Sequence, residues 1–430
     1  MNIAVVGAGY VGLTLAAVLA DFGHKVWVVR KDKEKNEGLK KGKIHFFEPD
    51  LEDLVKKNLK TGRLIPTTEY SQAIPFSQVI FIAVGTPSLS SGAVDLSQVF
   101  EAAKEIGKNL SLEYTVVVNK STCPPGTTRK VARIIEKFKP KKANFDVVFC
   151  PEFLREGSAV ENTKRPDRVV IGVESPKAAK IIKELHKQFK VPILLTKIES
   201  AELIKYAANS YLALRIVFAN QIADLCEKSG ADIEEVIKGM GTDKRIGLHY
   251  WYPGMGYGGS CFPKDVAAIA DFAKKKKITG SIFAVVDKLN KKRISQIIKK
   301  LESNFGSFVN KKVGVLGLAC KQGTDDIRES PAIKIIELLK KKRAKIIAYD
   351  PMAVENAKKV LSGVTFAKNS YEVTKDADCL LILTDWPEFG RLDYAKIKKL
   401  MRGNFVFDSR NILAKEKIKK LGYNYLGVGR

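Results

Sequence analysis

The sequence predicts an α/β protein with two Rossmann-like domains, each a doubly wound parallel sheet, joined by an all-helical middle domain with a long central helix. Short apolar strands alternate with helices towards both ends of the chain, which is typical of buried parallel sheets. The stretch between them has helical periodicity and no convincing strand. A glycine-rich turn follows the first strand directly. We therefore expect three domains, over residues 1–196, 197–303 and 304–430.

Apolar runs that end at a glycine or a polar loop mark the strands, and the helices lie between them. In the first domain, strands are expected at residues 3–6, 25–29, 78–84, 114–119, 147–150 and 169–173, and helices at residues 11–22, 51–60, 96–108 and 128–138. In the middle domain, one long helix is expected at residues 199–229 and a second helical stretch at residues 266–302. In the last domain, strands are expected at residues 313–317, 345–349, 379–384 and 405–408, and a helix at residues 332–342.

The composition is that of a globular protein with a strongly basic surface. Hydrophobic residues make up 45% of the 430 residues, and the formal net charge is +27. No apolar run reaches the ~18 residues that a membrane span needs. The lysine runs lie on predicted helix faces without interleaved aromatic residues, which favours a solvated surface over a nucleic-acid-binding one. We expect neither a nucleic-acid partner nor a membrane location.

Cysteine usage and the first residues of the chain indicate the cytoplasm. The six cysteines are scattered, so they suggest neither a disulfide framework nor, with only four histidines, a clustered metal site. The chain begins with a strand that runs straight into glycines, unlike a signal peptide. We expect a cytoplasmic protein that holds no metal ion.

The turn after the first strand fits the dinucleotide-binding pattern G-x-G-x-x-G. Its residues are Gly7, Ala8, Gly9, Tyr10, Val11 and Gly12. The first glycine makes the turn, the second lets a pyrophosphate approach the backbone, and the third lets the helix pack on the strand. Because the pattern lies between a strand and a helix, it predicts a bound dinucleotide.

The residue that ends the second strand influences which dinucleotide is held. An acid there binds the ribose 2′-hydroxyl of NAD, whereas a nearby arginine accommodates the 2′-phosphate of NADP. This chain has Arg30 at that position, and Asp32 lies two residues on, at the same side of an extended backbone. Either Arg30 favours NADP, or Asp32 binds the ribose and Arg30 stacks on the adenine. The residues leave both readings open.

Polar loops follow three further strands. Thr86 and Thr122 end strands whose carboxyl ends line the crevice of a doubly wound sheet, so each is a cofactor contact or a loop cap. Glu152 and Glu156 lie in one strand-end loop. They divide acid/base and cofactor roles between them, or they are ordinary surface charges.

A glycine-rich loop with a lone thiol lies ahead of a predicted helix. The loop reads Gly254-Met255-Gly256-Tyr257-Gly258-Gly259-Ser260-Cys261-Phe262-Pro263-Lys264-Asp265. A helix N-terminus carries partial positive charge, so a thiol just ahead of it is favoured as thiolate. We interpret Cys261 as a candidate nucleophile, and the glycines as a wall that lets a substrate approach closely. The alternative is a buried cysteine in an ordinary glycine-rich loop.

Further polar residues could serve the same site. Lys205 and Asn209 are four residues apart on the long predicted helix, so both project from one face and could stabilise an oxyanion. Otherwise they are a solvated lysine and an asparagine without a role. Arg and Lys residues at turns and strand ends suit a diphosphate, or they form surface ion pairs. These are Arg245, Lys321, Arg328 and Arg410.

Together these motifs resemble the UDP-glucose 6-dehydrogenase family over essentially the whole chain. The matching segments, in order, are Gly7 to Gly12, Gly85-Thr86-Pro87, Lys120-Ser121-Thr122, Pro151 to Gly157, Lys205 with Asn209, Arg245-Ile246-Gly247, Gly258 to Asp265, and Arg328-Glu329-Ser330. The motif around Cys261 is the most specific, and its Phe262 to Asp265 continuation favours glucose over N-acetylmannosamine within the wider family. Two residues depart from the family pattern: Arg30 replaces the usual acid, and Cys320 stands where many members have an aromatic that flanks the uridine.

The resemblance implies a four-electron oxidation of UDP-glucose to UDP-glucuronate by two NAD molecules, through a thiohemiacetal and a thioester of Cys261. Lys205 and Asn209 would stabilise the oxyanion, Asp265 would assist proton transfer and Glu152 would position water. Thr122 is counted with this catalytic set, and Glu156 and Arg328 with the cofactor contacts. The implied substrate contacts are Glu152, Phe153, Leu154, Lys205, Asn209, Arg245, Tyr250, Tyr252, Gly256, Tyr257, Gly258, Lys321 and Arg410.

The resemblance also implies a homodimer formed through the middle helical domain, with Arg245 reaching towards the partner subunit's site. The first alternative is a dehydrogenase of a UDP-N-acetylhexosamine. A second, from another class, is a non-catalytic protein that binds a nucleotide sugar or a nucleic acid. The complete set of Lys205, Asn209, Cys261 and Asp265 argues against a non-catalytic protein.

Overall fold

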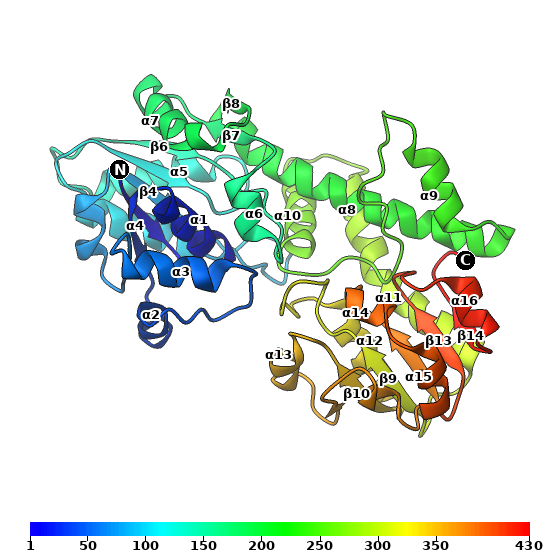
Figure 1. Cartoon of the computed structure of the whole chain (residues 1–430). Coiled ribbons are helices and arrows are strands. Elements are labelled where there is room, and N and C mark those ends of the chain that lie inside the picture. Colours follow the sequence, from blue (N-terminus) through cyan, green and yellow to red (C-terminus); the bar gives the residue numbers. More distant parts are fainter. The chain divides into compact units, whose positions relative to one another are not determined.

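The computed structural model describes all 430 residues, which divide into two compact units (Figure 1). The first unit holds Met1–Ala208 and Asp271–Lys276, and the second holds Asn209–Ala270 and Lys277–Arg430. The division falls within two helices, α8 (Ile198–Ser229) and α10 (Phe262–Lys275). Each unit has a sheet of its own. The three-domain division expected from the sequence stays a prediction.

An eight-stranded sheet forms the centre of the first unit, in the order β3-β2-β1-β4-β5-β6-β7-β8. Its strands are β1 (Asn2–Val6), β2 (Lys25–Val29), β3 (Leu64–Thr67), β4 (Val79–Ile82), β5 (Thr115–Asn119), β6 (Phe145–Phe149), β7 (Val169–Gly172) and β8 (Ile193–Thr196). The strand order reverses beside β1, whose neighbours are β2 and β4. The predicted doubly wound sheet is confirmed, and the glycine turn that follows β1 lies at its switch point.

One strand pair departs from the predicted parallel arrangement. β6 and β7 are antiparallel neighbours that meet at Phe149 and Gly172, and β8 runs parallel to β7. The chain leaves β6 at its carboxyl end, and α6 (Ala159–Lys164) stays beside the sheet on the face where Val160 joins the core. Because β7 is antiparallel to β6, the chain enters β7 from that same end of the sheet and runs back.

Helices cover both faces of this sheet, because successive strand residues point to opposite sides. Ile3 and Val5 of β1 share a core with α1 (Tyr10–Asp21), α3 (Leu51–Lys60), α6 and α7 (Pro176–His186). Ala4 and Val6 of β1 share a second core with α4 (Ser97–Asn109) and α5 (Thr127–Phe138). A short polar helix, α2 (Lys33–Lys40), follows β2.

A six-stranded sheet forms the centre of the second unit, in the order β11-β10-β9-β12-β13-β14. Its strands are β9 (Lys312–Leu316), β10 (Lys345–Tyr349), β11 (Thr365–Phe366), β12 (Cys379–Ile382), β13 (Phe405–Asp408) and β14 (Asn424–Leu426). Every pair is parallel, and the order reverses beside β9, so the second Rossmann-like sheet is confirmed as well. The helices of this sheet are α12 (Pro331–Lys341), α13 (Val354–Lys358), α14 (Pro387–Gly390), α15 (Tyr394–Leu400) and α16 (Lys415–Lys420).

The helical region consists of α8, α9 (Ile233–Gly241), α10 and α11 (Ile282–Phe305). The predicted helix over 199–229 is confirmed, because α8 runs for 32 residues. The predicted helical stretch over 266–302 consists of two separate helices, α10 and α11. Lys277 and Gly280 between them have positive φ, which ends one helix before Ser281 begins the next. Neither α8 nor any other helix is both long enough and apolar enough to span a membrane.

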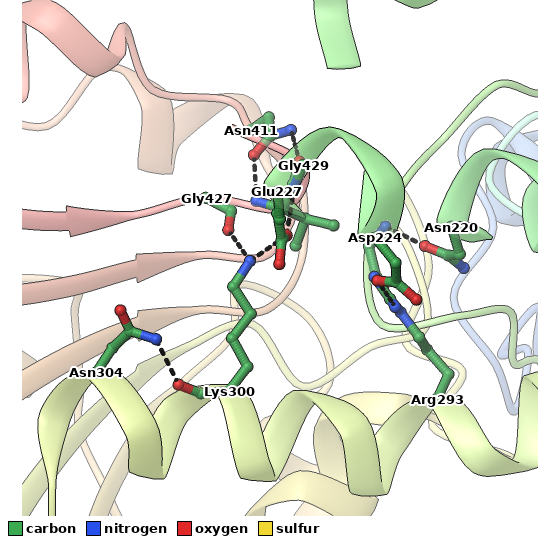
Figure 2. A network of polar contacts seen from close by, with 11 residues as sticks. Asn220, Asp224, Glu227, Arg293, Lys300, Asn304, Asn411, Gly427 and Gly429 are labelled. Atoms are coloured by element: carbon green, nitrogen blue, oxygen red, sulfur yellow. Dashed lines mark hydrogen bonds and ion pairs between the residues drawn. The ribbon is translucent and has the colours of Figure 1, made fainter. Parts of the chain in front are cut away.

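A polar network holds the last residues of the chain against α8 and α11 (Figure 2). Lys300 of α11 donates to the carbonyl of Gly427 at 2.6 Å and pairs with Glu227 of α8. The Glu227 carboxylate also accepts the amide N–H of Gly429 at 2.6 Å. Because these groups are fixed by side chains from two helices, the segment after β14 is anchored to the helical part of the second unit.

Candidate active site

The glycine turn after β1 leaves room for a ligand at only one of its three glycines. A Cβ on Gly7 would lie 2.3 Å from the carbonyl oxygen of Ala83, and one on Gly12 would lie 2.0 Å from that of Gly7. A Cβ on Gly9 would meet no atom within 4 Å. Gly9 is also the N-cap residue of α1 and supplies no side-chain cap. Open space at a helix N-terminus with uncapped amides fits a dinucleotide pyrophosphate.

The two charged residues after β2 take different positions. The guanidinium of Arg30 donates to the carbonyl of Ala8, inside the glycine turn, at 3.1 Å. The carboxylate of Asp32 accepts the amide N–H of Lys35 at 3.0 Å and so caps α2. Tyr10, the first residue of α1, packs its ring on Phe46 with the centroids 4.0 Å apart. The side chain of Arg30 thus lies beside the glycine turn, while that of Asp32 caps α2.

The loops after β4 and β5 lie side by side at the carboxyl edge of the sheet. The hydroxyl of Ser121 donates to the carbonyl of Val84 at 2.8 Å. Thr86 and Thr122 are both buried, at 7% and 8% exposure, in these two loops. Glu156 lies in the loop that follows β6, the next strand of the sheet. The predicted positions of these residues at neighbouring strand ends are confirmed, and their roles stay predictions.

Glu152 and Lys205 form a buried ion pair in the first unit. The ammonium of Lys205 lies 3.0 Å from Oε1 of Glu152, and the amide N–H of Leu154 donates to Oε2 at 2.8 Å. Burial alone would raise the pKa of Glu152, but the paired Lys205, the charge of Lys120 and the Leu154 hydrogen bond outweigh it and lower the pKa. Glu152 is therefore an ionised acceptor at neutral pH, and Lys205 is held in one place.

Lys120 is a residue of this site that sequence reasoning did not select. Its side chain is buried, its ammonium donates to the carbonyl of Cys150 at 3.2 Å, and its charge acts on Glu152. Burial raises the pKa of the Cys150 thiol, but the charges of Lys120 and His186 bring it down to about 7. The available signal was a lysine directly after the fully buried strand β5, where a charged side chain needs a partner.

Two cations lie over the ring of Phe153, in the loop that follows β6. The guanidinium of Arg168 is 3.6 Å from the centre of its ring, and the ammonium of Lys205 is 5.4 Å away. The ring faces both charges in the way that favours a cation–π contact. Glu152, Phe153 and Leu154, three of the predicted substrate contacts, are therefore brought together with Lys205.

In the second unit, the predicted position of the thiol at a helix start is confirmed. α10 begins at Phe262, directly after Cys261, and the amide N–H of Asp265 donates to the carbonyl of Cys261 at 3.0 Å. The hydroxyl of Ser260 lies 3.4 Å from the sulfur of Cys261. The sulfur thus belongs to a residue whose carbonyl opens the first helical turn, where the helix dipole favours a thiolate.

Asp265 is completely buried one turn after Cys261 and is held by two donors. The side-chain amide of Asn209, on α8, donates to Oδ2 at 2.6 Å, and the ammonium of Lys264 lies 2.5 Å from Oδ1. Asn209 is therefore fixed by Asp265, just as Lys205, four residues earlier on α8, is fixed by Glu152. Both polar side chains of the predicted helix face have an acidic partner.

The glycines of the segment from Gly254 to Cys261, which we call the thiol loop, serve the packing of the protein more than we expected. A Cβ would lie 2.8 Å from Ser409 O at Gly254, 2.5 Å from the Asn290 side chain at Gly256, and 2.4 Å from Glu329 O at Gly258. At Gly259, which has φ +84°, a Cβ would meet nothing within 4 Å. Neighbouring protein atoms therefore occupy the space beside the first three glycines, and the role of this loop as a wall for a substrate stays a prediction.

Three helix residues that sequence reasoning missed clamp this loop. Asn220 of α8 accepts the amide N–H of Gly254 at 2.7 Å, and Arg293 of α11 donates to the carbonyl of Gly254 at 2.8 Å. Asn290, also on α11, accepts the amide of Tyr257 at 2.9 Å and donates to its carbonyl at 3.0 Å. Figure 2 shows Arg293 reaching from α11 to its ion-pair partner on α8. Asn220 and Arg293 are buried and Asn290 is partly buried, and no local sequence pattern marks them as partners of a distant loop.

Residues at the carboxyl edge of the second sheet touch the same loop. The carbonyl of Arg328 accepts both the amide N–H of Gly259, at 3.0 Å, and the thiol of Cys320, at 3.1 Å. Arg410, after β13, donates to the carbonyl of Cys320 at 3.0 Å. Lys321 follows Cys320 at the switch point beside β9. This edge therefore gathers cationic residues next to the thiol loop, which suits an anionic substrate.

Arg245 lies in an exposed turn. Its guanidinium pairs with Asp243 at 2.6 Å and is 89% exposed. The turn that carries it is anchored by Arg215 of α8, which donates to the carbonyls of Ile246 and Gly247 at 2.9 and 3.1 Å.

The predicted tyrosine contacts surround the start of α10. The rings of Tyr250 and Tyr257 both pack near Phe262, with centroids 6.3 and 6.0 Å away. Tyr252 packs on Tyr250 but stays 51% exposed.

Comparison with known proteins gives the same family throughout the chain. Residues 1–190 match the NAD binding domain of the UDP-glucose/GDP-mannose dehydrogenase family, residues 199–292 its central domain and residues 314–415 its UDP binding domain. The chain is 44% identical to UDP-glucose 6-dehydrogenase TuaD of Bacillus subtilis, covering 100% of this chain and 93% of that protein. It is also 44% identical to UDP-glucose 6-dehydrogenase of Rhizobium meliloti, covering 100% of both.

A solved structure extends this likeness to the fold. A UDP-glucose dehydrogenase from the hyperthermophilic archaeon Pyrobaculum islandicum superposes with a TM-score of 0.93 at 37% identity, covering 100% of this chain and 97% of that one. The resemblance predicted from the motifs is confirmed. The chain therefore belongs to the UDP-glucose/GDP-mannose dehydrogenase family.

Proposed function

We propose that this protein is a UDP-glucose 6-dehydrogenase, which oxidises C6 of UDP-glucose to the carboxylate of UDP-glucuronate with NAD. The observation that carries the proposal is the thiol of Cys261 at the start of α10, with the buried Asn209–Asp265 pair one turn further on. The relatives named above, at 44% identity over the whole chain, support UDP-glucose as the substrate.

The glycine turn of the first unit is the proposed NAD site. Gly7 and Gly12 let the chain turn and pack, and Gly9 leaves the space in which the pyrophosphate meets the amides at the start of α1. The further proposed contacts are Tyr10, Val11, Arg30, Asp32, Thr86, Thr122, Glu156 and Arg328. When bound, NAD⁺ accepts one hydride from C6 at each of the two oxidation stages, so that four electrons leave the sugar in all.

Cys261 is the proposed nucleophile. Its thiolate adds to the aldehyde carbon formed in the first stage, so a C–S bond forms and the carbonyl oxygen becomes an oxyanion. The ammonium of Lys205 and the amide of Asn209 stabilise that oxyanion. The second stage leaves a thioester on the sulfur. Water then attacks the thioester carbon, the C–S bond breaks, and the thiolate is restored as the carboxylate forms.

Glu152, Thr122 and Asp265 complete the proposed catalytic set. Because pairing with Lys205 lowers the pKa of Glu152, this carboxylate suits orienting a water molecule by accepting its hydrogen bond. Thr122 supplies a hydroxyl, and its side chain is buried in the loop after β5. Asp265 assists proton transfer at the thiol from its place one helical turn away.

The second sheet is the proposed UDP site. Arg410 and Lys321 lie at its carboxyl edge and supply charge for the diphosphate. Gly256, Tyr257 and Gly258 form the wall beside the sugar, with Tyr250 and Tyr252 near the start of α10. The proposed division of labour is cofactor binding in residues 1–196, the thiol and dimer contacts in 197–303, and UDP binding in 304–430.

A homodimer through the helical region is supported by an exposed apolar stripe on α8. Tyr211, Phe218 and Leu225 follow one another at seven-residue spacing and are 56%, 44% and 60% exposed. Side chains at this spacing line one face of a helix, as in helix pairs that associate. Arg245 is the residue proposed to reach the partner subunit's site, since its guanidinium is exposed.

A cytoplasmic location is supported by the cysteines. All six are present as thiols, and four are buried in the cores. Unpaired buried thiols are typical of proteins from a reducing compartment.

The test is to incubate the protein with UDP-glucose and NAD⁺, follow the absorbance of the reduced cofactor, and identify the product by mass spectrometry. Two reduced cofactors per sugar and UDP-glucuronate as product are expected. In the parallel reaction, UDP-N-acetylglucosamine and UDP-N-acetylmannosamine should turn over much more slowly. Faster turnover of either would identify an N-acetylhexosamine dehydrogenase instead, and no turnover of any would contradict the catalytic reading.

A further inference from the structure

Arg30 lies at the position that discriminates between the ribose 2′-hydroxyl of NAD and the 2′-phosphate of NADP in a dinucleotide-binding fold. It follows β2 directly, and β2 pairs in parallel with β1, whose end opens the glycine turn. Its amide N–H donates to the carbonyl of Thr67 at 2.9 Å, so its backbone continues the sheet ladder. In this fold the side chain at the end of the second strand meets the adenosine ribose.

The guanidinium of Arg30 is held at the turn from two sides. Nη1 donates to the carbonyl of Ala8, between the first two glycines, at 3.1 Å. The imidazole of His45 lies 3.0 Å from Nη1 through Nδ1 and 3.3 Å from Nη2 through Nε2. Desolvation, together with the adjacent Arg30 charge, lowers the pKa of His45 to about 4. The ring is therefore neutral at physiological pH, so it can accept a hydrogen bond from the guanidinium.

The Asp32 carboxylate, the other candidate ribose ligand, is engaged as the N-cap of α2. Asp32 accepts the amide N–H of Lys35 at 3.0 Å as the cap of α2, and the ammonium of Lys35 lies 3.2 Å from its other oxygen. If this carboxylate turned to a ribose, the start of α2 would lose its cap, which destabilises the helix. The groups nearest to the turn are thus a fixed cation and a neutral imidazole, which suit an anion.

We propose that Arg30 and His45 form a 2′-phosphate subsite, so that the chain binds NADP⁺ in addition to NAD⁺. The proposal rests on the dinucleotide site of the proposed function and adds to it a second cofactor. A planar guanidinium binds a phosphate through two parallel N–H donors, which the single hydroxyl of NAD cannot match. His45 acts as a positioning residue, because it orients the guanidinium through the hydrogen bond it accepts.

The test uses equilibrium binding of two fragments that differ only in the 2′-phosphate, adenosine 5′-monophosphate and adenosine 2′,5′-bisphosphate, measured by calorimetry. A charge-assisted hydrogen-bond pair predicts about tenfold to hundredfold tighter binding of the bisphosphate. Arg30→Met should remove this preference while the monophosphate still binds, which shows that the turn is intact. Lys25→Met, at the other end of β2, removes the same charge and should leave the preference unchanged.

Equal binding of both fragments to the unaltered protein would overturn the subsite and leave the NAD site standing. A preference that survives Arg30→Met, or that Lys25→Met removes equally, would overturn it too, because it would then reflect the basic surface as a whole. Failure of both fragments to bind would overturn the subsite together with the proposed dinucleotide site. Direct titration with NADP⁺ and NAD⁺ should follow the same order as the fragments.

Discussion

Lys205 and Glu152 form an ion pair that is buried on both sides, with Nζ 3.0 Å from Oε1 and side-chain exposures of 3% and 8%. Each partner makes the burial of the other tolerable, because an unpaired charge in a protein interior is strongly unfavourable. The paired Lys205 also contributes to the lowered pKa of the Glu152 carboxyl. Two residues with proposed parts in catalysis are therefore also structurally dependent on each other.

The pair predicts that its two residues are coupled in stability. Lys205→Met should lower the free energy of unfolding by about 3–5 kcal/mol, because it leaves Glu152 buried without a partner. Adding Glu152→Gln should recover part of that loss, so the double variant is more stable than the sum of the single effects predicts. Urea unfolding of the four proteins measures both quantities.

The exposed pair of Lys35 with Asp32 is the matched control. Its side chains are 50% and 42% exposed, so Lys35→Met should change stability far less than Lys205→Met does. Strictly additive effects at Lys205 and Glu152 would contradict the coupling.

The clamp on the thiol loop predicts that α11 controls the thiol. Asn290→Ala frees both the amide and the carbonyl of Tyr257, four residues before Cys261. We expect kcat to fall by up to about a hundredfold, because small displacements of a reacting group are costly. Alkylation of Cys261 by iodoacetamide should become faster as the loop loosens.

Asn304→Ala on the same helix is the control for that variant. Its side chain bonds only the carbonyl of Lys300, within α11, and is exposed. It should change neither kcat nor the alkylation rate. If Asn290→Ala also left both unchanged, the loop would be held without this clamp.

Local chemistry made the glycine turn and the thiol position predictable from sequence. The turn is fixed by residues within six positions, and the thiol by the helix that starts beside it. The clamps were not predictable, because Asn290 and Tyr257 are 33 residues apart and only the folded chain brings them together. The antiparallel β6–β7 pair was not predictable for another reason: a short apolar strand does not reveal its direction.

The short elements α2 and β3 escaped prediction for compositional reasons. Five of the eight residues in α2 are charged, so the helix has little apolar periodicity, and Asp32 at its start fits a ribose ligand as well as a helix cap. β3 contains Pro66, which argues against a central strand but is allowed here, because β3 lies at the edge of the sheet.

Two neighbouring glycines of the thiol loop predict different responses to alanine. At Gly258 the new Cβ would lie 2.4 Å from the carbonyl oxygen of Glu329, so Gly258→Ala must displace backbone. At Gly259 the space is open, and the cost is the positive φ alone, about 1–2 kcal/mol. Thermal unfolding should therefore show a larger loss for Gly258→Ala. An equal or smaller loss would show that the Glu329 turn can move aside.

His45 predicts a dependence of stability on pH with a definite sign. Its pKa falls from 6.5 to about 4 on folding, so the unfolded chain takes up the proton more readily than the folded one. The free energy of unfolding should therefore decline through this group as the pH falls from about 6.5 to 4. His45→Gln removes the titration and should lose less stability than the unaltered protein between pH 7 and pH 5. Parallel urea unfolding at the two pH values measures the difference, and equal losses would contradict it.

The exposed stripe on α8 predicts that one charge separates the proposed dimer. Phe218→Glu places a carboxylate between Tyr211 and Leu225, and its desolvation opposes association, so light scattering should report monomers. Val360→Glu, at a residue 57% exposed near the end of α13, is the control and should leave the mass unchanged.

The same variant tests the proposed role of Arg245 across the subunits. If Arg245 serves the partner's site, monomers lack it, and Phe218→Glu should raise the KM for UDP-glucose as Arg245→Ala does. Because both changes would remove the same contact, combining them should add little to either one alone. A double variant whose KM rises by the product of the two single effects would separate Arg245 from the dimer and leave its guanidinium a surface partner of Asp243.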